Sequence, residues 1–466
     1  MNINELKNKI LQLAIQGKLV PQDENDIPAS VLLEEIKKEK EQLIKEKKIK
    51  KEKPLPEITE EEKPFKIPKG WEWVRLGMIA NIIMGQSPDS SYVSEDKNGI
   101  EFHQGKTAFG KKILDKSGLF CKKPTKVAEA GDILLSVRAP VGAVNFTDRE
   151  VCIGRGLTAV RAINNKDNRF IFYIIKALEK ELISKATGTT FLAISSKEIK
   201  ELVIPLPSVA EQHRIVQKVD ELFEIVDELA ENKEAMLKNI SDTRNKILQL
   251  AIQGKLVEQN PEETPASLLL EEIRKEKELL IKEKKIKKEK LLPEITEEEK
   301  PFEIPKGWEW VRFAQITFCR DGERVAVSSK DRSEREKVYD YYGASGVIDK
   351  IDSYIFDKPL LLIGEDGANL ISRSTPIAFI ATGQYWVNNH AHVIDSLNII
   401  ILKYLEVYIN AIDLKPYVTG TAQPKLNQAN LNNILVPLPS VAEQLRIVEK
   451  VDEIMAYLDE LEKTIM

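Results

Sequence analysis

Residues 208–256 read SVAEQHRIVQKVDELFEIVDELAENKEAMLKNISDTRNKILQLAIQGKL. Apolar residues recur in this stretch at alternating spacings of four and three, interrupted only at Lys233 and Thr243; they are Ile215, Val219, Leu222, Val226, Leu229, Met236, Ile240, Ile247 and Leu250. An apolar residue every 3.5 positions over several heptads is typical of a coiled coil. At about 1.5 Å per residue the helix would be roughly 70 Å long, so we expect it to need a partner helix.

The partner is a second copy of the same stretch, divided between the two ends of the chain. PLPSVAEQHRIVQKVDEL at 205–222 recurs as PLPSVAEQLRIVEKVDEI at 437–454, and NKILQLAIQGKLV at 245–257 recurs at 8–20. Self-similarity at a fixed period indicates an internal structural repeat. We therefore predict two near-equal antiparallel helices, with a pseudo-twofold relation between the halves of the chain.

Composition narrows the class of protein. The chain has 466 residues, enough for two or three domains, with 42% hydrophobic residues, 31% charged residues and a net charge of −5. Its three widely spaced cysteines predict neither a disulfide framework nor a metal-ligand pair, which suits a reducing cytoplasm. We see no signal peptide and no apolar run of membrane length, and we expect a cytoplasmic protein that does not bind membranes.

The repeats divide the chain into seven predicted segments. They are an N-terminal helix that completes the distal helix (1–20), a charged helical arm (21–70), a first globular domain (71–205), the central coiled-coil helix (206–257), a second charged arm (258–307), a second globular domain (308–437) and the distal helix (438–466). The arm sequences at 34–53 and 271–290 differ at two positions only. We interpret each arm as a solvated helix, or alternatively as a basic arm against DNA phosphate or a partner subunit.

Both globular domains have mixed strand and helix patterns. In the first, residues 131–146 and 152–163 have strand composition, and residues 167–186 predict an amphipathic helix capped by Asp167 or Asn168. The fold class is therefore α+β, with two domains joined by a long antiparallel two-helix coiled coil. The scaffold is nearly identical in the two halves, whereas the inserted domains are almost unrelated. Two different inserted domains on a repeated scaffold would suit a DNA target with two separated half-sites, one for each domain.

Catalytic motifs are weak in this sequence. Gly99–Thr107 resembles a phosphate loop but has five residues between its glycines instead of four. Asp89, Glu95 and Asp96 imitate a Mg²⁺-dependent nuclease signature, although such carboxylates normally converge from neighbouring strands. Glu365 and Asp366 lie between glycines and suit a polar turn better than a metal site. We predict a non-catalytic chain without a metal site.

The four histidines do not form an evident ligand set. His213 lies on the central helix, where its repeat counterpart is Leu445. His390 and His392 alternate along a strand, but no third ligand accompanies them in sequence. We expect core packing, or base or phosphate contact, rather than zinc binding.

At this point the residues support a resemblance to a known family. The duplicated NKILQLAIQGKLV, the IPKGWEWVRL strand start and the paired PLPSVAEQ helix starts resemble the specificity subunit of Type I restriction–modification enzymes. GDILLSVRAPVG at 131–142, YYGASGVIDKIDSYIFD at 341–357, LLIGEDGANL and WVNNHAHV look like sequences of its target-recognition domains. The resemblance covers essentially the whole chain. It implies that 71–205 and 308–437 are target-recognition domains, each reading half of a bipartite site in double-stranded DNA.

The resemblance also implies partners. Two methyltransferase subunits would dock on the coiled coil, and endonuclease/translocase subunits would join that core. S-adenosylmethionine, ATP and Mg²⁺ would belong to those subunits, with no cofactor in this chain. Two alternatives remain open, a self-sufficient Mg²⁺-dependent nuclease using Asp89 and Glu95, and a coiled-coil adaptor whose domains bind proteins.

The family does not specify which residues contact DNA, so candidates come from side-chain chemistry. By count the first domain carries about +5 and the second about −2, so bulk charge cannot serve both, and local groups must make phosphate and base-edge contacts. Asn and Gln suit adenine, and Arg suits guanine. The predicted DNA-binding residues are Gln86, Ser87, Lys106, Arg138, Arg155, Thr189 and Thr190 in the first domain, and Arg324, Tyr342, Asn388, Asn389, His390, Gln423 and Lys425 in the second.

Overall fold

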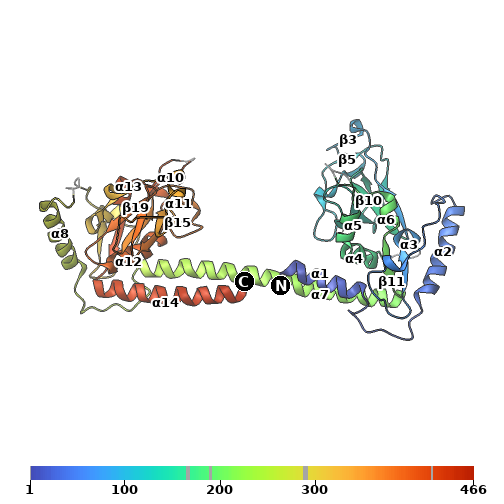
Figure 1. Ribbon diagram of the computed structural model, residues 1–466, viewed down its shortest axis with the longest axis horizontal. Coiled ribbons are helices and arrows are strands. Elements are labelled where there is room, and N and C mark those ends of the chain that lie inside the picture. Colours follow the sequence, from blue (N-terminus) through green and yellow to red (C-terminus); the bar gives the residue numbers. More distant parts are fainter. Residues whose placement is uncertain (1, 164–167, 188–191, 287–291, 421–422) are drawn as a thin grey trace. The chain divides into compact units, whose positions relative to one another are not determined.

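The computed structural model describes residues 2–163, 168–187, 192–286, 292–420 and 423–466. The chain separates into two compact units, Met1–Asn232 (unit 1) and Lys233–Met466 (unit 2). It passes from one unit to the other within helix α7 (Val209–Ile252), which is 44 residues long. Each unit combines strands, helices and one part of α7 (Figure 1).

In unit 1 the first part of α7 packs against helix α1 (Ile3–Ile15) in antiparallel orientation (Figure 1). Lys7, near the start of α1, forms an ion pair with Asp227, whereas Gln22, beyond its end, donates to Glu211 near the start of α7. The apolar residues that the two helices share in the core are Ile10, Leu11, Ile15, Ile215, Val219 and Val226. The predicted packing of the N-terminal helix is therefore confirmed.

In unit 2 helix α14 (Val441–Ile465) packs in the same way on the last part of α7 (Figure 1). Arg244 pairs with Asp459 at 2.5 Å and with Glu462 at 2.7 Å. The apolar residues between these helices are Ile247, Leu248, Ala251, Ile252, Ile447, Val448, Val451 and Met455. These two helix pairs confirm the α+β fold class with an antiparallel coiled coil.

The predicted apolar seam is not buried along its whole length. Leu229 in unit 1 is 56% exposed, and Met236 in unit 2 is 47% exposed. Both positions lie in the middle part of α7. For these two positions the burial implied by heptad periodicity is wrong.

Unit 1 contains two larger sheets besides a two-stranded ribbon. One has the order β2-β10-β7-β8 with antiparallel neighbours, and the other has the order β3-β5-β4-β9-β6, in which β4 and β9 are parallel. The strands are β2 (Ala80–Met84), β3 (Val93–Ser94), β4 (Ile100–His103), β5 (Phe120–Cys121), β6 (Val127–Ala128), β7 (Ile133–Ser136), β8 (Val144–Phe146), β9 (Val151–Ile153) and β10 (Leu157–Ala162). The predicted strands within 152–163 are thus β9 and β10, in different sheets.

Unit 2 repeats the larger part of this plan. Its four-stranded sheet has the order β13-β19-β16-β17, and a smaller sheet has the order β15-β14-β18 with β14 and β18 parallel. The strands are β13 (Phe318–Cys319), β14 (Tyr339–Gly343), β15 (Gly346–Ile351), β16 (Leu360–Gly364), β17 (Ala378–Ala381), β18 (Tyr385–Val387) and β19 (Ala391–Asp395). Helix α12 (Ile399–Ala411) packs on this sheet.

The chain enters and leaves each domain through a two-stranded antiparallel ribbon. In unit 1, β1 (Glu72–Arg75) pairs with β11 (Val203–Leu206); in unit 2, β12 (Glu309–Arg312) pairs with β20 (Leu435–Leu438). Each ribbon therefore brings the two ends of an inserted domain together, which makes that domain a self-contained insertion.

The helix expected at 167–186 is two helices. Helix α4 (Arg169–Ala177) is followed by Leu178 at its C-cap, and α5 (Glu179–Lys185) begins directly after it. The break allows Leu182 to join the core together with the apolar face of α4. Asn168 precedes α4 without a side-chain cap; its amide bonds Ala162 N–H and Gly131 O instead. Asp167 lies outside the described residues.

The charged arms begin as helices that are only partly solvated. Helix α2 (Ala29–Lys45) buries Ala29, Leu32 and Ile36, and α8 (Ala266–Lys282) buries the equivalent Ala266, Leu269 and Ile273. The expectation of a solvated helix over 34–53 and 271–290 is therefore wrong at Ile36 and Ile273, which are buried. None of the described helices combines the length and apolar composition needed to cross a membrane.

Candidate DNA-reading loops

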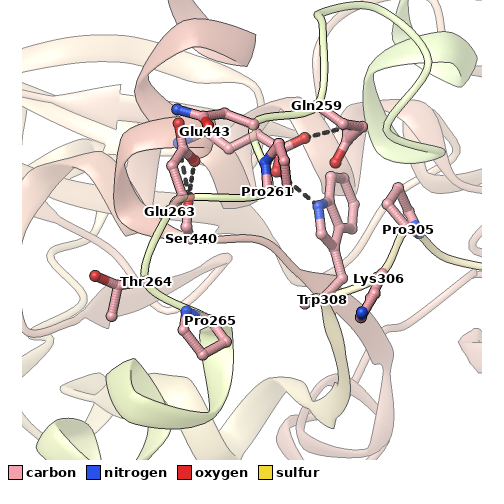
Figure 2. Close-up of a pocket in the computed structure, with 12 residues that line it drawn as sticks. Gln259, Pro261, Glu263, Thr264, Pro265, Pro305, Lys306, Trp308, Ser440 and Glu443 are labelled. Atoms are coloured by element: carbon pink, nitrogen blue, oxygen red, sulfur yellow. Dashed lines mark hydrogen bonds between the residues drawn. The ribbon is translucent and has the colours of Figure 1, made fainter.

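A network of hydrogen bonds between polar side chains, which we call the polar lock, connects the scaffold segments of each unit. In unit 2, Trp308 Nε1 donates to Glu443 at 2.8 Å, Gln259 donates to the same carboxylate, and Ser440 donates to Glu263. Figure 2 shows these residues around a cavity of about 490 Å³. Unit 1 has the same lock, in which Trp71 Nε1 donates to Glu211 at 2.7 Å. Because these polar groups bond to one another, we assign the cavity to the scaffold rather than to a ligand.

The predicted DNA-binding residues of unit 1 gather where several strands end. The loop 154–156 joins β9 to β10 and contacts the loops after β2, β4 and β7, and residues 192–194 contact the loop after β7; we call this set of segments the loop cluster. Its backbone hydrogen bonds are Gly154 N to His103 O (2.8 Å), Val137 N to Gly156 O (2.9 Å), Ala139 N to Leu192 O (3.0 Å) and Ile194 N to Val137 O (3.0 Å). Glycines allow this close approach, since a Cβ on Gly154 would lie 2.4 Å from Gln104 Oε1.

Exposed polar side chains project from this cluster. Ser87 Oγ donates to Gln104 Oε1 at 2.9 Å and accepts from Arg155 N–H at 3.3 Å. The side chains of Lys106, Arg138 and Arg155 are exposed and form no ion pair with any described residue. Cations without internal partners are available to a polyanion.

The other predicted residues of unit 1 are placed as follows. Gln86 is exposed and its backbone bonds Ile153 O, so it also belongs to the cluster. Thr189 and Thr190 lie outside the described residues. Gln104 was missed by sequence reasoning, although it shares with Ser87 and Arg138 the signal of a polar residue just after a strand.

Unit 2 builds the same loop cluster from different residues. The equivalent backbone hydrogen bonds are Asn388 N to Tyr342 O (3.1 Å), Glu365 N to His390 O (2.8 Å), Gly367 N to Pro424 O (3.0 Å) and Leu426 N to Glu365 O (2.8 Å). A bridge between Arg138 and Ala193 in unit 1 corresponds to one between Asp366 and Lys425 in unit 2. The equivalent positions are therefore Gln104 and Gly343, Arg138 and Asp366, and Arg155 and Asn389.

The cations of this second cluster are mostly paired. The Arg324 side chain is 13% exposed and bonds Glu365 at 2.8 Å and Ala391 O at 2.6 Å, and it lies 3.3 Å from Asp321. Lys425 lies 3.1 Å from Glu365. Burial raises the pKa of Glu365, but the bonds from Arg324 and Lys425 and the nearby His392 outweigh burial, so the pKa is lowered. These contacts favour a structural role for Arg324.

Asn388 and Tyr342 also have internal contacts. Asn388 is 5% exposed and its Oδ1 accepts the His390 N–H at 2.8 Å. The Tyr342 ring stacks on Phe379 with centroids 5.8 Å apart. These contacts argue against base contact by Asn388 and leave Tyr342 as a partly buried support. Asn389, His390, Gln423 and Lys425 are the predicted residues that stay exposed.

One group in the described part of the chain resembles a metal site. Asp321, Glu365 and His392 place potential ligand atoms within 4.8 Å of one another. His392 is 1% exposed, and its Nδ1 and Nε2 lie 2.6 Å from Asp321 and 2.8 Å from Leu426 O. Burial raises the pKa of Asp321, but the hydrogen bond from His392 outweighs burial and lowers it. Because Arg324 and Lys425 already neutralise these carboxylates, we interpret the group as an ion-pair network.

The alternative catalytic motifs do not assemble. Asp89 accepts hydrogen bonds from Ser91 N–H (2.9 Å) and Oγ–H (2.7 Å), Asp96 pairs with Lys122, and Glu95 is exposed in the same loop. These carboxylates thus stabilise a turn instead of converging from neighbouring strands. Residues 100–103 form β4, and the 3₁₀ turn at 106–108 is not the helix that a phosphate loop needs.

The match of one family model to two segments of the chain agrees with this duplicated architecture. The family model described as Type I restriction modification DNA specificity domain matches residues 68–239 and 305–466. The EcoAI and EcoEI Type I restriction enzyme specificity subunits of Escherichia coli are each 31% identical to this chain, over 98% of its length and 90% of theirs. The solved HsdS subunit of Thermoanaerobacter tengcongensis is 33% identical, covers 49% of this chain and 50% of its own, and has a TM-score of 0.34.

Proposed function

This chain belongs to the family of Type I restriction–modification DNA specificity subunits, and from that premise we propose how it selects DNA. Each loop cluster reads one half of a bipartite duplex site. The observation that carries the proposal is that one backbone framework, held by four equivalent hydrogen bonds, presents different side chains in the two units. The backbone framework, which is the same in both units, positions the duplex, and the side chains, which differ between the units, select different bases.

The first cluster contacts DNA through exposed cations and amides. Lys106, Arg138 and Arg155 contact phosphates or guanine edges, with Gln86 beside them. Thr189 and Thr190, which lie outside the described residues, remain candidates from the sequence. In the second cluster the exposed candidates are Asn389, His390, Gln423 and Lys425. His390 Nδ1 lies 2.8 Å from Asp366, so its Nε2 is the nitrogen left for DNA.

The chain supplies specificity and leaves chemistry to partners. Two methyltransferase subunits dock on the paired helices α1, α7 and α14, whose sequences repeat in the two halves, and endonuclease/translocase subunits join them. S-adenosylmethionine, ATP and Mg²⁺ bind those partners.

Domain exchange tests the proposal. Residues 308–437 are replaced by the corresponding insert of another family member, and adenine methylation by the assembled complex is mapped by single-molecule sequencing. We expect one half-site to change and the other to stay the same, because each inserted domain is closed by its own ribbon. A variant with only the junction residues altered is the control. A change in both half-sites, or in neither, would contradict the proposal.

A further inference from the structure

Gln104 occupies the centre of the first loop cluster. It follows β4 directly and is exposed. Its neighbours are the backbones of Gly105, Gly154 and Gly156, and Gly156 N donates to Gln104 O at 3.1 Å. No bulky side chain from these neighbours covers its amide, so a base edge can approach it.

Ser87 fixes which way this amide points. Because Ser87 Oγ accepts the Arg155 N–H, its own proton is directed to Gln104 Oε1. A carbonyl oxygen has two acceptor sites, so Oε1 keeps one. Nε2 keeps both of its hydrogens, since it has no partner among the described residues. The amide thus presents one acceptor and one donor side by side.

That pattern matches one base in particular. Adenine offers an N6 donor and an N7 acceptor in the major groove, and glutamine binds this pair in a bidentate manner. The surrounding Lys106, Arg138 and Arg155 can hold phosphates while the amide selects the base. The equivalent position in unit 2 is Gly343, which has no side chain to contribute, so this contact belongs to unit 1 alone.

We propose that Gln104 reads an adenine in the half-site recognised by unit 1 and that Ser87 positions its amide. The inference rests on the proposed function and adds to it the base that Gln104 recognises. Gln104 is the specificity-determining residue, and Ser87 acts through it.

The experiment maps methylation motifs of the full chain assembled with its methyltransferase subunits. Wild type is compared with Gln104→Ala and Gln104→Glu, and Gln42→Glu, on the exposed surface of α2 in the same unit, is the matched control. We expect Gln104→Ala to lose discrimination at one A·T pair by about ten- to hundredfold. Gln104→Glu should shift preference there toward cytosine, because a carboxylate only accepts hydrogen bonds.

Ser87 is tested by a rescue. Ser87→Ala should weaken discrimination at the same pair, and Ser87→Thr, which keeps the hydroxyl, should restore it. Asn389→Ala should alter the other half-site, the one recognised by unit 2. That half-site must remain unchanged in every Gln104 and Ser87 variant, which excludes general misfolding.

Failure of this inference can be separated from failure of the proposed function. Unchanged motifs in both Gln104 variants, or a loss of discrimination at a G·C pair, would overturn the role of Gln104 while two half-sites are still read. If the wild-type chain with its partners directs no sequence-specific methylation, the proposed function itself fails.

Discussion

At the scale of single residues, the two clusters differ in what their arginines bind. Arg155 in unit 1 has no ionic partner among the described residues, whereas Arg324 in unit 2 bonds Glu365 and lies beside Asp321. An exposed arginine without a partner contributes little to stability and is available to phosphate. A largely buried one cannot be removed without leaving carboxylates uncompensated.

Two alanine substitutions should therefore have opposite effects. Arg155→Ala should change the free energy of unfolding by less than about 0.5 kcal/mol but weaken DNA binding and lower its salt dependence by about one unit of slope. Arg324→Ala should lower the free energy of unfolding by about 3 kcal/mol. Denaturant unfolding and DNA titrations at several salt concentrations measure both. A stable Arg324→Ala, or an unchanged salt slope in Arg155→Ala, would contradict the assignments.

At the scale of elements, α12 links the sheet of unit 2 to α14. It packs against α14, and its Tyr404 donates to Pro437 O in β20, just before α14, at 2.6 Å. Glu406 lies half-buried on this helix, where burial, assisted by Asp452 on α14, raises its pKa to about 7 against opposition from Ile380 N–H and Lys403. The helix thus carries a carboxyl group that the folded protein prefers to keep protonated.

The pH dependence of stability follows from that preference. Because the folded pKa is raised, the stabilising contribution of Glu406 is complete below its ordinary pKa of 4.5 and is lost as pH rises through about 7. Glu406→Gln should then exceed wild type in free energy of unfolding by about 3 kcal/mol near pH 8, with no difference near pH 4. Glu449→Gln, on the exposed face of α14, is the control. Parallel pH profiles for wild type and Glu406→Gln would disprove the assignment.

At the scale of the whole molecule, the chain consists of two units with a repeated scaffold, and α7 contributes one part to each. Gly17 and Gly254 end equivalent helices with φ of +66°, and a Cβ at either would lie 2.4 Å from a proline ring. The helix ends are therefore fixed in the same way twice, and α7 is the element in which length can vary without disturbing either lock.

An insertion in α7 tests whether the length of this helix sets the distance between the half-sites. Adding seven residues after Asn232 keeps the heptad register and should alter the number of base pairs between the half-sites, by roughly three. The bases of each half-site should stay the same, because the loop clusters are untouched. Methylation mapping gives the result, with the same insertion after exposed Asn98 as control. An unchanged spacer would contradict the role of α7 in setting the distance between the half-sites.

The sequence determined the scaffold because the patterns that specify the scaffold helices are local or repeated. The heptad spacing in 208–256 and the copies at 8–20 and 437–454 fixed the helices and their partners. It also named Ser87, Arg138 and Arg155 as candidates from side-chain chemistry alone, and the structure places all three in one loop cluster. It could not show that Leu229 and Met236 stay exposed, or that 167–186 breaks at Leu178, since both depend on the residues packed against the helix.

Tertiary structure alone decided which side chains are available for contact. Arg155 and Arg324 look alike in sequence, yet the second meets Glu365 because β13, β16 and β19 are neighbours in one sheet. Gln104 gains its orientation from Ser87 and Arg155, which are distant in the chain and meet where separate strands end. Hydrogen bonds and ion pairs of this kind depend on strand order, and strand order is set by packing of the whole domain rather than by any local pattern.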